Sequence, residues 1–307
     1  MRFPKFSGEW EICKVSELLD FYSTNSLSWE QLEYGEKAMM NLHYGLIHVG
    51  LPTMVDLRRD KLPNVKEGNM PKNFELCKEG DVAFADASED TNEVAKVIEL
   101  FNLDNKDIVC GLHTIHGRDN KNKTIVGFKG YAFSSSAFHN QIRRIAQGTK
   151  IYSISTKNFS ECYVGIPSKA EQTKIATLLR LIDERIATQN KIIEKLQSLI
   201  KGLSQQLLSS ENDWILYRLD DLAQIKSGYS GTQVSYQTPY KVSRIETISK
   251  HCIDIQRIGY VECIPESYRL NVGNILFSNI NSIQYIGNTA YLDKDYGLYH
   301  GMNLLRS

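Results

Sequence analysis

The stretch "IPSKAEQTKIATLLRLIDERIATQNKIIEKLQSLIKGLSQQLLSS", residues 166–210, divides a chain that otherwise consists mostly of strand-like segments. Pro167 ends the preceding strand, because its ring disfavours helical geometry at the residue before it. Ser168, with Glu171 three residues later, forms the pattern of a capping box. The sequence therefore predicts one helix over residues 168–210, which at 1.5 Å per residue is about 64 Å long.

Apolar residues recur along this predicted helix at spacings of three and four, with one glutamine among them, as in a coiled-coil seam. The opposite face is charged, and two consecutive spacings of four, from Leu178 through Ile182 to Ile186, predict a local unwinding of the supercoil. We therefore favour a helix that pairs with another helix over the alternative, a core helix of one large domain. The predicted seam consists of Ile175, Leu178, Ile182, Ile186, Gln189, Ile193, Leu196, Ile200, Leu203 and Leu207.

The 307 residues provide enough chain for two domains with their own cores. The 36 basic residues balance the 36 acidic ones, so any charged partner must be bound by a local patch. The six cysteines are scattered without a CxxC pair, which predicts free thiols in a reducing compartment and no metal site. No stretch approaches the roughly 18 apolar residues that cross a bilayer, and we expect a cytoplasmic protein.

The chain is expected to be α+β, with two α/β domains joined by the long helix. Residues 1–167 form the first predicted domain, 168–210 the coiled-coil helix and 211–307 the second domain. Within the first domain, residues 79–87 and 123–135 are predicted as strands, and 93–103 as a helical segment.

The second domain opens like the first. Residues 9–26 align with 213–230, and residues 75–97 align more weakly with 269–290, so that Gly80 matches Gly273. An internal duplication explains both similarities. Residues 105–167 find little or no counterpart before Ser307, so we expect the second domain to be incomplete and the chain to be truncated within it.

These segments together resemble the specificity subunit of type I restriction–modification enzymes. The resemblance rests on "IPSKAEQTKIATLLRLID" (166–183), "GLHTI" (111–115), "GTKIYSIS" (148–155) and the repeated opening. It implies target recognition domains that each read half of a split DNA site, held apart by helices on which methyltransferase subunits dock. It further implies that methylation and cleavage, with S-adenosylmethionine, ATP and Mg²⁺, belong to modification and restriction subunits. This chain itself is expected to be non-catalytic and to carry no cofactor.

Charge within the first domain changes sign along the sequence. Ten acidic residues lie in 75–107, whereas 111–150 holds seven basic residues against the single acid Asp119. Lysine and arginine contact phosphates, and arginine and asparagine can also read base edges. A solvated basic loop is the alternative. The residues predicted to contact double-stranded DNA are Arg118, Asn120, Lys121, Asn122, Lys123, Arg143 and Arg144.

Other signals predict no chemistry. His113 and His116 lie three residues apart, but no third ligand follows nearby, so a structural role is favoured over a metal site. Neither a phosphate-binding loop nor a nucleotide-binding glycine motif is present, and no catalytic constellation can be assembled. Two alternatives to an intact DNA-reading subunit stay open. One is a truncated half-subunit that homodimerises through the middle helix, or a silent cassette product, and the other is an enzyme whose active site the sequence does not reveal.

Overall fold

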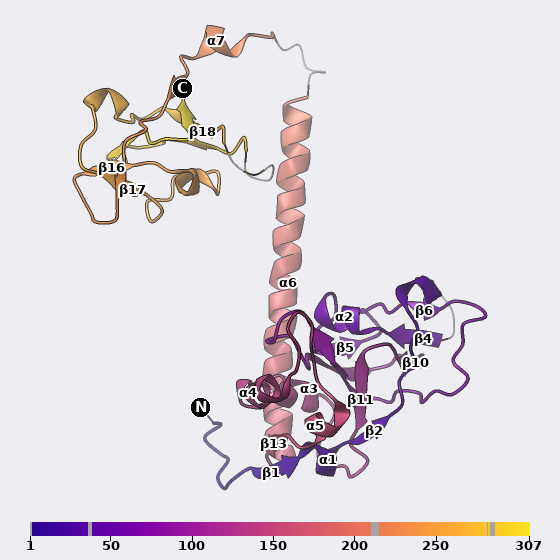
Figure 1. Ribbon diagram of the computed structural model, residues 1–307. Helices are drawn as coiled ribbons and strands as arrows, with labels where there is room; N and C mark the ends of the chain where they lie inside the picture. Colours follow the sequence, from indigo (N-terminus) through magenta and orange to yellow (C-terminus); the bar gives the residue numbers. More distant parts are fainter. Residues whose placement is uncertain (1, 36–38, 210–214, 281, 283–285) are drawn as a thin grey trace. The chain divides into compact units, whose positions relative to one another are not determined.

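The computed structural model describes residues 2–35, 39–209, 215–280, 282 and 286–307 (Figure 1). The chain divides into two compact units, Met1–Gly202 and Leu203–Ser307, each of which is described by itself. The predicted α+β fold with one long helix is confirmed. In the ranges that the structure describes, no helix is both long and apolar enough to cross a membrane.

The centre of unit 1 is a mainly antiparallel five-stranded sheet. In spatial order it consists of β2 (Asp20–Tyr22), β11 (Thr114–Arg118), β7 (Val82–Ala85), β9 (Val97–Asn102) and β5 (Met54–Asp56). Only the β5–β9 pair is parallel. Four phenylalanines pack edge to face or tilted against one side of the sheet and join it to the short helices (Phe84, Phe133, Phe138 and Phe159). The other side packs on a second, aliphatic core.

A smaller four-stranded sheet lies at the second core. Its order is β10 (Asp107–Cys110), β4 (Met39–Leu42), β6 (Asn64–Val65) and β3 (Leu32–Glu33), with β10 parallel to β4. Two further pairs complete unit 1: β1 (Glu11–Lys14) with β13 (Tyr163–Ile166), and β8 (Ala87–Ser88) with β12 (Tyr152–Ser153).

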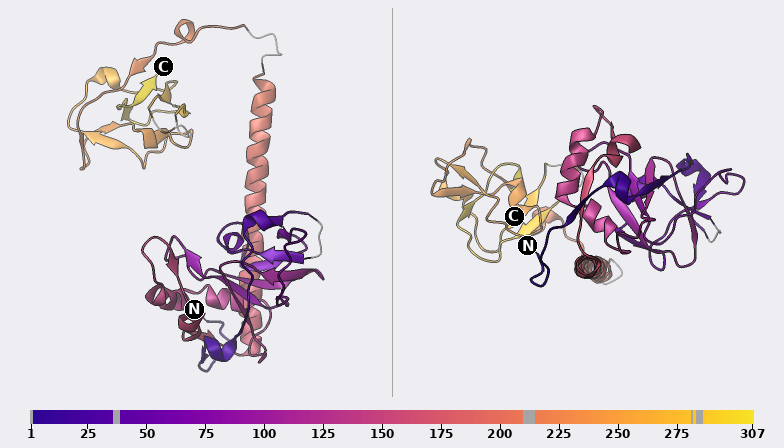
Figure 2. Two further views of the ribbon diagram at one scale, coloured as in Figure 1. Left: turned by 45° about the vertical axis from the view of Figure 1, so that its right-hand side comes forward. Right: turned by 90° about the horizontal axis from the view of Figure 1, so that it is seen from below.

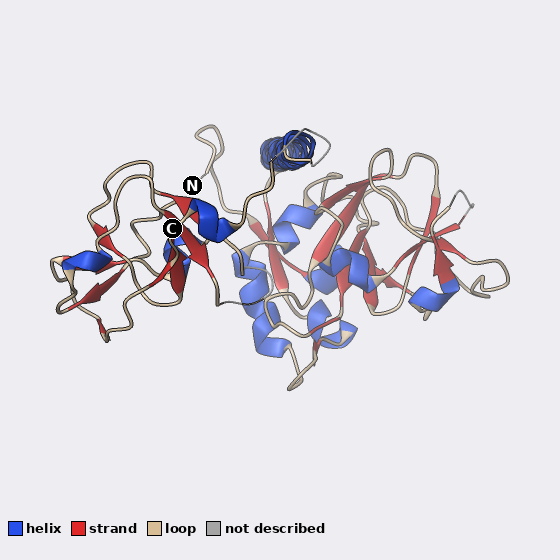
Figure 3. Ribbon diagram, turned by 90° about the horizontal axis from the view of Figure 1, so that it is seen from above, coloured by secondary structure: helices blue, strands red, loops and turns tan. Residues whose placement is uncertain are grey.

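The helices of unit 1 other than α6 are short, and α3, α4 and α5 pack together (Figure 3). They are α1 (Val15–Leu18), α2 (Tyr44–His48), α3 (Lys129–Phe133), α4 (Ser136–Ile145) and α5 (Thr156–Ser160), with the 3₁₀ turn η1 (Trp29–Gln31).

Two local predictions within unit 1 are wrong. Residues 93–103, predicted as helical, contain strand β9, whose first four residues are all buried. A strand covered on both faces loses its alternation, so its apolar run imitates a helical pattern. Residues 123–135, predicted as a strand, form a turn and α3, and Gly127 adopts a φ of 91° that glycine tolerates readily.

Helix α6 (Lys169–Leu207) begins one residue after the predicted cap. Ser168 Oγ accepts from Glu171 N at 3.4 Å, but the Glu171 carboxylate pairs with Arg2 Nη2 at 2.6 Å instead of closing the capping box. Buried Gln172 fixes the first turn to unit 1, because its amide bonds Lys123 O, Pro167 O and Ile125 N at 2.9–3.0 Å. The helix then runs along unit 1 at least as far as Asp183, whose carboxylate accepts a hydrogen bond from the Tyr131 hydroxyl at 2.7 Å, and only its later part leaves the body of unit 1 (Figures 1 and 2).

Unit 2 has two four-stranded sheets. The first, in order, is β14 (Lys226–Ser227), β21 (Leu304–Arg306), β18 (Ile275–Ser278) and β19 (Thr289–Tyr291). The second is β15 (Gln233–Val234), β17 (Gly259–Val261), β16 (Tyr240–Val242) and β20 (Leu298–Tyr299). Helix α7 (Leu219–Leu222) precedes β14, the 3₁₀ turn η2 (Ile245–Ile248) lies between β16 and β17, and η3 (Glu266–Tyr268) lies between β17 and β18 on a connection from the second sheet to the first.

The two units repeat one topology. The order β14–β21–β18–β19 matches β2–β11–β7–β9, and β20–β16–β17–β15 matches β10–β4–β6–β3, including the parallel outer pair. The turn before the central strand is also the same: Gly80 and Gly273 have φ of 84° and 92°, and Asp81 and Asn274 each accept a backbone N–H three residues earlier.

This correspondence corrects one part of the prediction that residues 105–167 have little or no counterpart, because β10 and β11, within residues 107–118, do have counterparts in unit 2. Strands β20 and β21 occupy the places of β10 and β11, so the repeat continues through Arg306. The sequence signal is weak there because only Gly111 and Gly301 coincide, whereas the left-handed residue after them is His113 in one unit and Asn303 in the other.

Candidate nucleic-acid interface

Helix α4 is an amphipathic platform built on the aromatic core. Ser135 caps it by accepting a hydrogen bond from Phe138 N at 3.3 Å. Phe138 and Ile142, four residues apart, are buried on its inner face. Gln141 ties the helix to β13, since its amide donates to Tyr163 O at 2.8 Å and accepts from Tyr163 N at 2.9 Å. The outer face of α4 is therefore held in a fixed position.

Arg143 and Arg144 are exposed in the last turn of this platform. Neither guanidinium forms a hydrogen bond or ion pair with any residue in the described ranges. Beside Arg143 lies a cleft of about 330 Å³, whose polar lining includes His139, Asn92 and Lys96. Two unpaired cations on a rigid helix can contact phosphates without first breaking an internal bond.

The loop after β11 holds four of the other predicted DNA contacts in a compact turn. Asp119 organises it by accepting from Lys121 N at 3.0 Å and from both the N–H and the hydroxyl of Thr124 at 2.7 Å. Asn122 takes up the left-handed conformation at the tip, with φ of 53°. The loop is thus ordered by its own side chains.

Three side chains of this loop are engaged with acidic or carbonyl groups of unit 1. Asn120 donates to Asp20 at 2.8 Å and to the Tyr22 hydroxyl at 2.7 Å. The Lys121 ammonium donates to Glu17 O at 2.8 Å, and that of Lys123 pairs with Glu11 at 2.7 Å. Asn122 is exposed. The contacts of this loop lie on β1, α1 and β2, whereas Gln141 ties α4 to β13, the strand that pairs with β1.

Arg118 does not suit the role predicted for it. It is buried, and its guanidinium binds both oxygens of Asp81 at 2.8–2.9 Å, Glu75 at 2.7 Å and Leu76 O at 2.8 Å. A side chain with these four bonds has no free donor face for a phosphate. We therefore remove Arg118 from the predicted DNA contacts. Sequence reasoning missed its partner, because Asp81 lies 37 residues earlier.

Asp81 is the centre of this buried network. Burial opposes its ionisation, but hydrogen bonds from His116 and Arg118 together hold the pKa of the carboxyl below its ordinary value. The hydrogen bonds of Arg118 to Asp81 and Glu75 raise the pKa of its guanidinium. His116 Nε2 lies 2.7 Å from Asp81 Oδ2, while His113 Nδ1 lies 3.1 Å from Asp86 on the surface. The two histidines therefore share no site.

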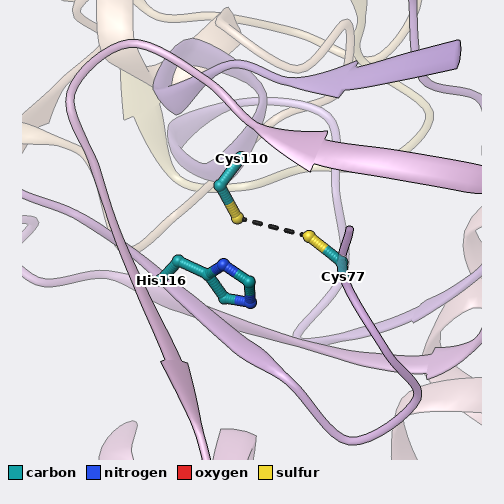
Figure 4. Close-up of side chains that lie close together, drawn as sticks. All are labelled: Cys77, Cys110 and His116. Carbon is teal, nitrogen blue, oxygen red and sulfur yellow. Dashed lines mark hydrogen bonds between the residues drawn. The ribbon is translucent and has the colours of Figure 1, made fainter. Parts of the chain in front are cut away.

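Among the residues described, three groups could hold a metal together: Cys77, Cys110 and His116 (Figure 4).

The predicted seam of α6 is exposed along most of its length. Ile175 is half-buried against unit 1, and Gln189 is exposed. The remaining seam residues, from Leu178 to Leu207, are each 45–66% exposed. Leu181, Ile192 and Leu199 widen the stripe and are similarly exposed. The apolar face is therefore broader than the predicted narrow seam, as in helices that pack against more than one neighbour.

Part of the chain is similar to proteins of a known family. Residues 60–198 match the family model described as the type I restriction modification DNA specificity domain. A specificity subunit of the type I restriction enzyme MjaX from Methanocaldococcus jannaschii is 46% identical over 99 residues, covering 30% of this chain and 23% of that protein. The specificity subunit of the type I restriction enzyme EcoKI from Escherichia coli is 22% identical over 189 residues, covering 55% of this chain and 41% of that protein.

Two solved structures share the fold. The S subunit of a type I restriction–modification system from M. genitalium matches all of this chain and 75% of its own length, with a TM-score of 0.57 and 17% identity. A second structure, from work on the complex assembly and conformational transition of the type I R-M system, matches 98% of this chain and 76% of its own chain, with a TM-score of 0.51 and 14% identity. The matched regions span less than half the length of either curated relative.

Proposed function

We propose, on the premise that this chain is a member of the type I restriction–modification specificity-subunit family, that it recognises double-stranded DNA and positions partner subunits on it. The premise is supported by the domain match at residues 60–198 and by the named relatives. In this proposal unit 1 reads one part of a split site, and the repeated topology of unit 2 supplies a second recognition unit. The protein then works in the cytoplasm, where the chromosome lies.

The observation that carries DNA recognition is the pair Arg143 and Arg144 on the rigid outer face of α4. Of the predicted cations, these two have no internal partner in the described part of the chain, so their binding to phosphates costs no lost ion pair. The cleft beside Arg143 offers the polar side chains of Asn92 and His139 for contacts beyond the phosphate. The chain is proposed to be non-catalytic, with methylation and cleavage carried out by partner subunits that bind S-adenosylmethionine, ATP and Mg²⁺.

A salt titration of DNA binding tests the placement. Each phosphate contact contributes about 0.9 to the slope of log affinity against log salt. The double variant Arg143→Gln/Arg144→Gln is expected to flatten the slope by about 1.8 and to weaken binding to a mixed-sequence duplex by about 60-fold at 0.1 M salt. The matched control is Lys121→Gln/Lys123→Gln, which removes the same charge from side chains already bonded within unit 1 and is expected to change the slope by less than half as much.

An unchanged slope in the arginine variant would remove α4 from the interface. If only the lysine control flattened the slope, the loop after β11 would take its place, as the sequence alone suggests.

Recognition itself is tested by mapping methylated sites in cells with and without the gene. A bipartite motif indicates two reading units, a palindrome indicates one unit used twice, and the absence of any motif would indicate a silent product.

A second candidate function is assembly through α6, and the exposed apolar face favours it. The stripe from Leu178 to Leu203 is uncovered by unit 1, and water-exposed apolar surface of this extent commonly marks an interaction site. We propose that an antiparallel helix, from a second copy of this chain or from a modification subunit, covers it. Sedimentation of the chain alone distinguishes the two: a dimer lost in Leu196→Gln/Ile200→Gln supports self-pairing. A monomer that binds modification subunits, and loses them in this variant, supports the other partner.

A further inference from the structure

Cys77, Cys110 and His116 bring one potential ligand atom each to a single buried point of unit 1 (Figure 4). Cys77 belongs to the long connection between β6 and β7, Cys110 ends β10, and His116 lies in the middle of β11. The two sulfurs are 3.6 Å apart, and all three ligand atoms lie within 4.8 Å of one another. The residues are 33 and 6 positions apart along the chain, so this cluster has none of the short spacings by which metal motifs are recognised in a sequence.

The hydrogen bond of His116 shows which ring nitrogen is free. Its Nε2 is 2.7 Å from Asp81 Oδ2, and Asp81 is an ionised acceptor because Arg118 binds both of its oxygens. Nε2 must therefore carry the proton and donate it. Nδ1 is then left with a lone pair, and it has no hydrogen-bond partner within the described residues although the side chain is fully buried. A buried acceptor without a partner is destabilising unless something else occupies that position.

We propose that Cys77, Cys110 and His116 Nδ1 bind a single zinc-type divalent ion. Two thiolates on a tetrahedral ion, each with a Zn–S distance of about 2.3 Å, are about 3.7 Å apart, which agrees with the observed separation of 3.6 Å. The imidazole completes a Cys₂His set, and a water molecule supplies the fourth ligand. Asp81 fixes the imidazole from its other side, as carboxylates commonly do for metal-bound histidine.

The fully buried charges of the site sum to zero when the ion is bound, and the second carboxylate on Arg118, that of Glu75, is 36% exposed to solvent. Two thiolates neutralise one divalent cation, and the Asp81 carboxylate is neutralised by the Arg118 guanidinium. A buried site without net charge avoids the penalty of an unpaired buried ion. The ion would join three separate segments of unit 1, since β10 belongs to the smaller sheet and β11 to the central one. Its role is therefore structural.

Unit 2 shows that the fold itself does not require these residues. The positions that correspond to Cys77, Cys110 and His116 in its matching strands are Leu270, His300 and Arg306. Leu270 N donates to Leu298 O as Cys77 N donates to Ile108 O, so the backbone is equivalent although the ligand set is not. The Cys₂His set is a property of unit 1 alone.

Loading the full chain with Co²⁺, the spectroscopic probe for zinc sites, tests the proposal. Reduced wild-type protein is expected to bind about one Co²⁺ per chain, with the visible bands of tetrahedral cobalt and a thiolate-to-cobalt charge-transfer band. Zinc should displace the probe, and chelation should lower the thermal unfolding temperature. This measurement needs no variant, so a folding defect cannot obscure it.

Variants assign the ligands. Cys110→Ser is expected to reduce the charge-transfer band by about half, because one of two thiolates is lost, and His116→Asn to shift the visible bands while both thiolates remain. Cys162→Ser is the matched control, because Cys162 is also a buried thiol of unit 1 and should change neither. The proposal is overturned by less than about a tenth of an equivalent of bound Co²⁺, or by bands that lack a thiolate contribution. A mass lower by two hydrogen atoms after purification without reductant, with Cys77 and Cys110 unreactive, would also overturn it by revealing a disulfide.

Discussion

Replacing Arg118 with methionine tests whether this arginine is a structural residue, as its burial indicates, or a DNA contact, as its position in a basic segment suggests. Methionine keeps much of the side-chain volume and removes the guanidinium. Asp81 then stays buried with only the Lys78 N–H and His116 as donors. Breaking one partner of a buried ion pair in this way commonly costs about 3–5 kcal/mol.

The loss should appear as faster opening of the central sheet. If amide exchange in β7 and β11 reports the opening of unit 1, 3–5 kcal/mol corresponds to exchange faster by about 10²–10⁴-fold. Hydrogen–deuterium exchange measured by mass spectrometry follows both strands in the full chain. Arg180→Met is the matched control, because it removes an arginine of α6 that is only about two-thirds covered, pairs with Glu184 at 2.6 Å and lies over the Phe101 ring. An exposed pair four residues apart is worth only about 0.3–0.5 kcal/mol.

The reasoning is refuted if Arg118→Met is no more destabilising than Arg180→Met. If it also flattened the salt slope of DNA binding while the fold stayed intact, Arg118 would return to the predicted interface. The opposite pair of results, a destabilised sheet and an unchanged salt slope, would establish Arg118 as a structural residue.

Three further predictions concern particular side chains. Burial lowers the pKa of His300 to about 4 from an ordinary 6.5, so stability present above pH 6.5 should fall by about 3 kcal/mol as pH drops through 4. The protection factors of peptides from 290–307, which are corrected for the intrinsic pH dependence of exchange, should fall between pH 7 and 5, but not in His300→Gln. Gly273→Ala should lower the free energy of unfolding by about 1–2 kcal/mol, because alanine is strained at a positive φ. Gly80→Ala should lower it further, because the new methyl group also meets Val126 at 3.0 Å. Equal shifts of the thermal unfolding temperature in the two variants would contradict this. Gln172→Ala removes three hydrogen bonds of the Gln172 amide and should lower the free energy of unfolding by about 1–3 kcal/mol. Amide exchange should become faster only at the start of α6. Faster exchange along the whole helix would contradict this prediction.

The features that sequence predicted well are those encoded by neighbouring residues. The long helix follows from Pro167, Ser168 and a regular apolar spacing, and the repeat is marked by Gly80 and Gly273, whose positive φ the same turn requires in both units. Strand β9 was misread because burial on both faces hides its alternation.

The candidate sites depend on contacts that no local pattern encodes. Arg118 and Arg143 are equally basic in sequence, but one lies against Asp81 and the other on the outside of α4. Cys77, Cys110 and His116 meet only because the connection before β7 crosses the end of β10. Charge and residue type can thus be read directly, whereas the partner that neutralises a charge depends on tertiary structure.

The anchoring of α6 at one end has a geometric consequence. Gln172 fixes the rotation of the helix about its own axis at the first turn, so every later residue inherits its angular position from that bond. One inserted residue advances the helix by about 1.5 Å but turns everything beyond it by about 100°, whereas seven inserted residues advance it by about 10 Å and return it to within about 20°. A change in the length of this helix therefore rotates its far end before it appreciably displaces that end, and among short insertions those of seven or eleven residues return the helix to within about 20° of its original angular position.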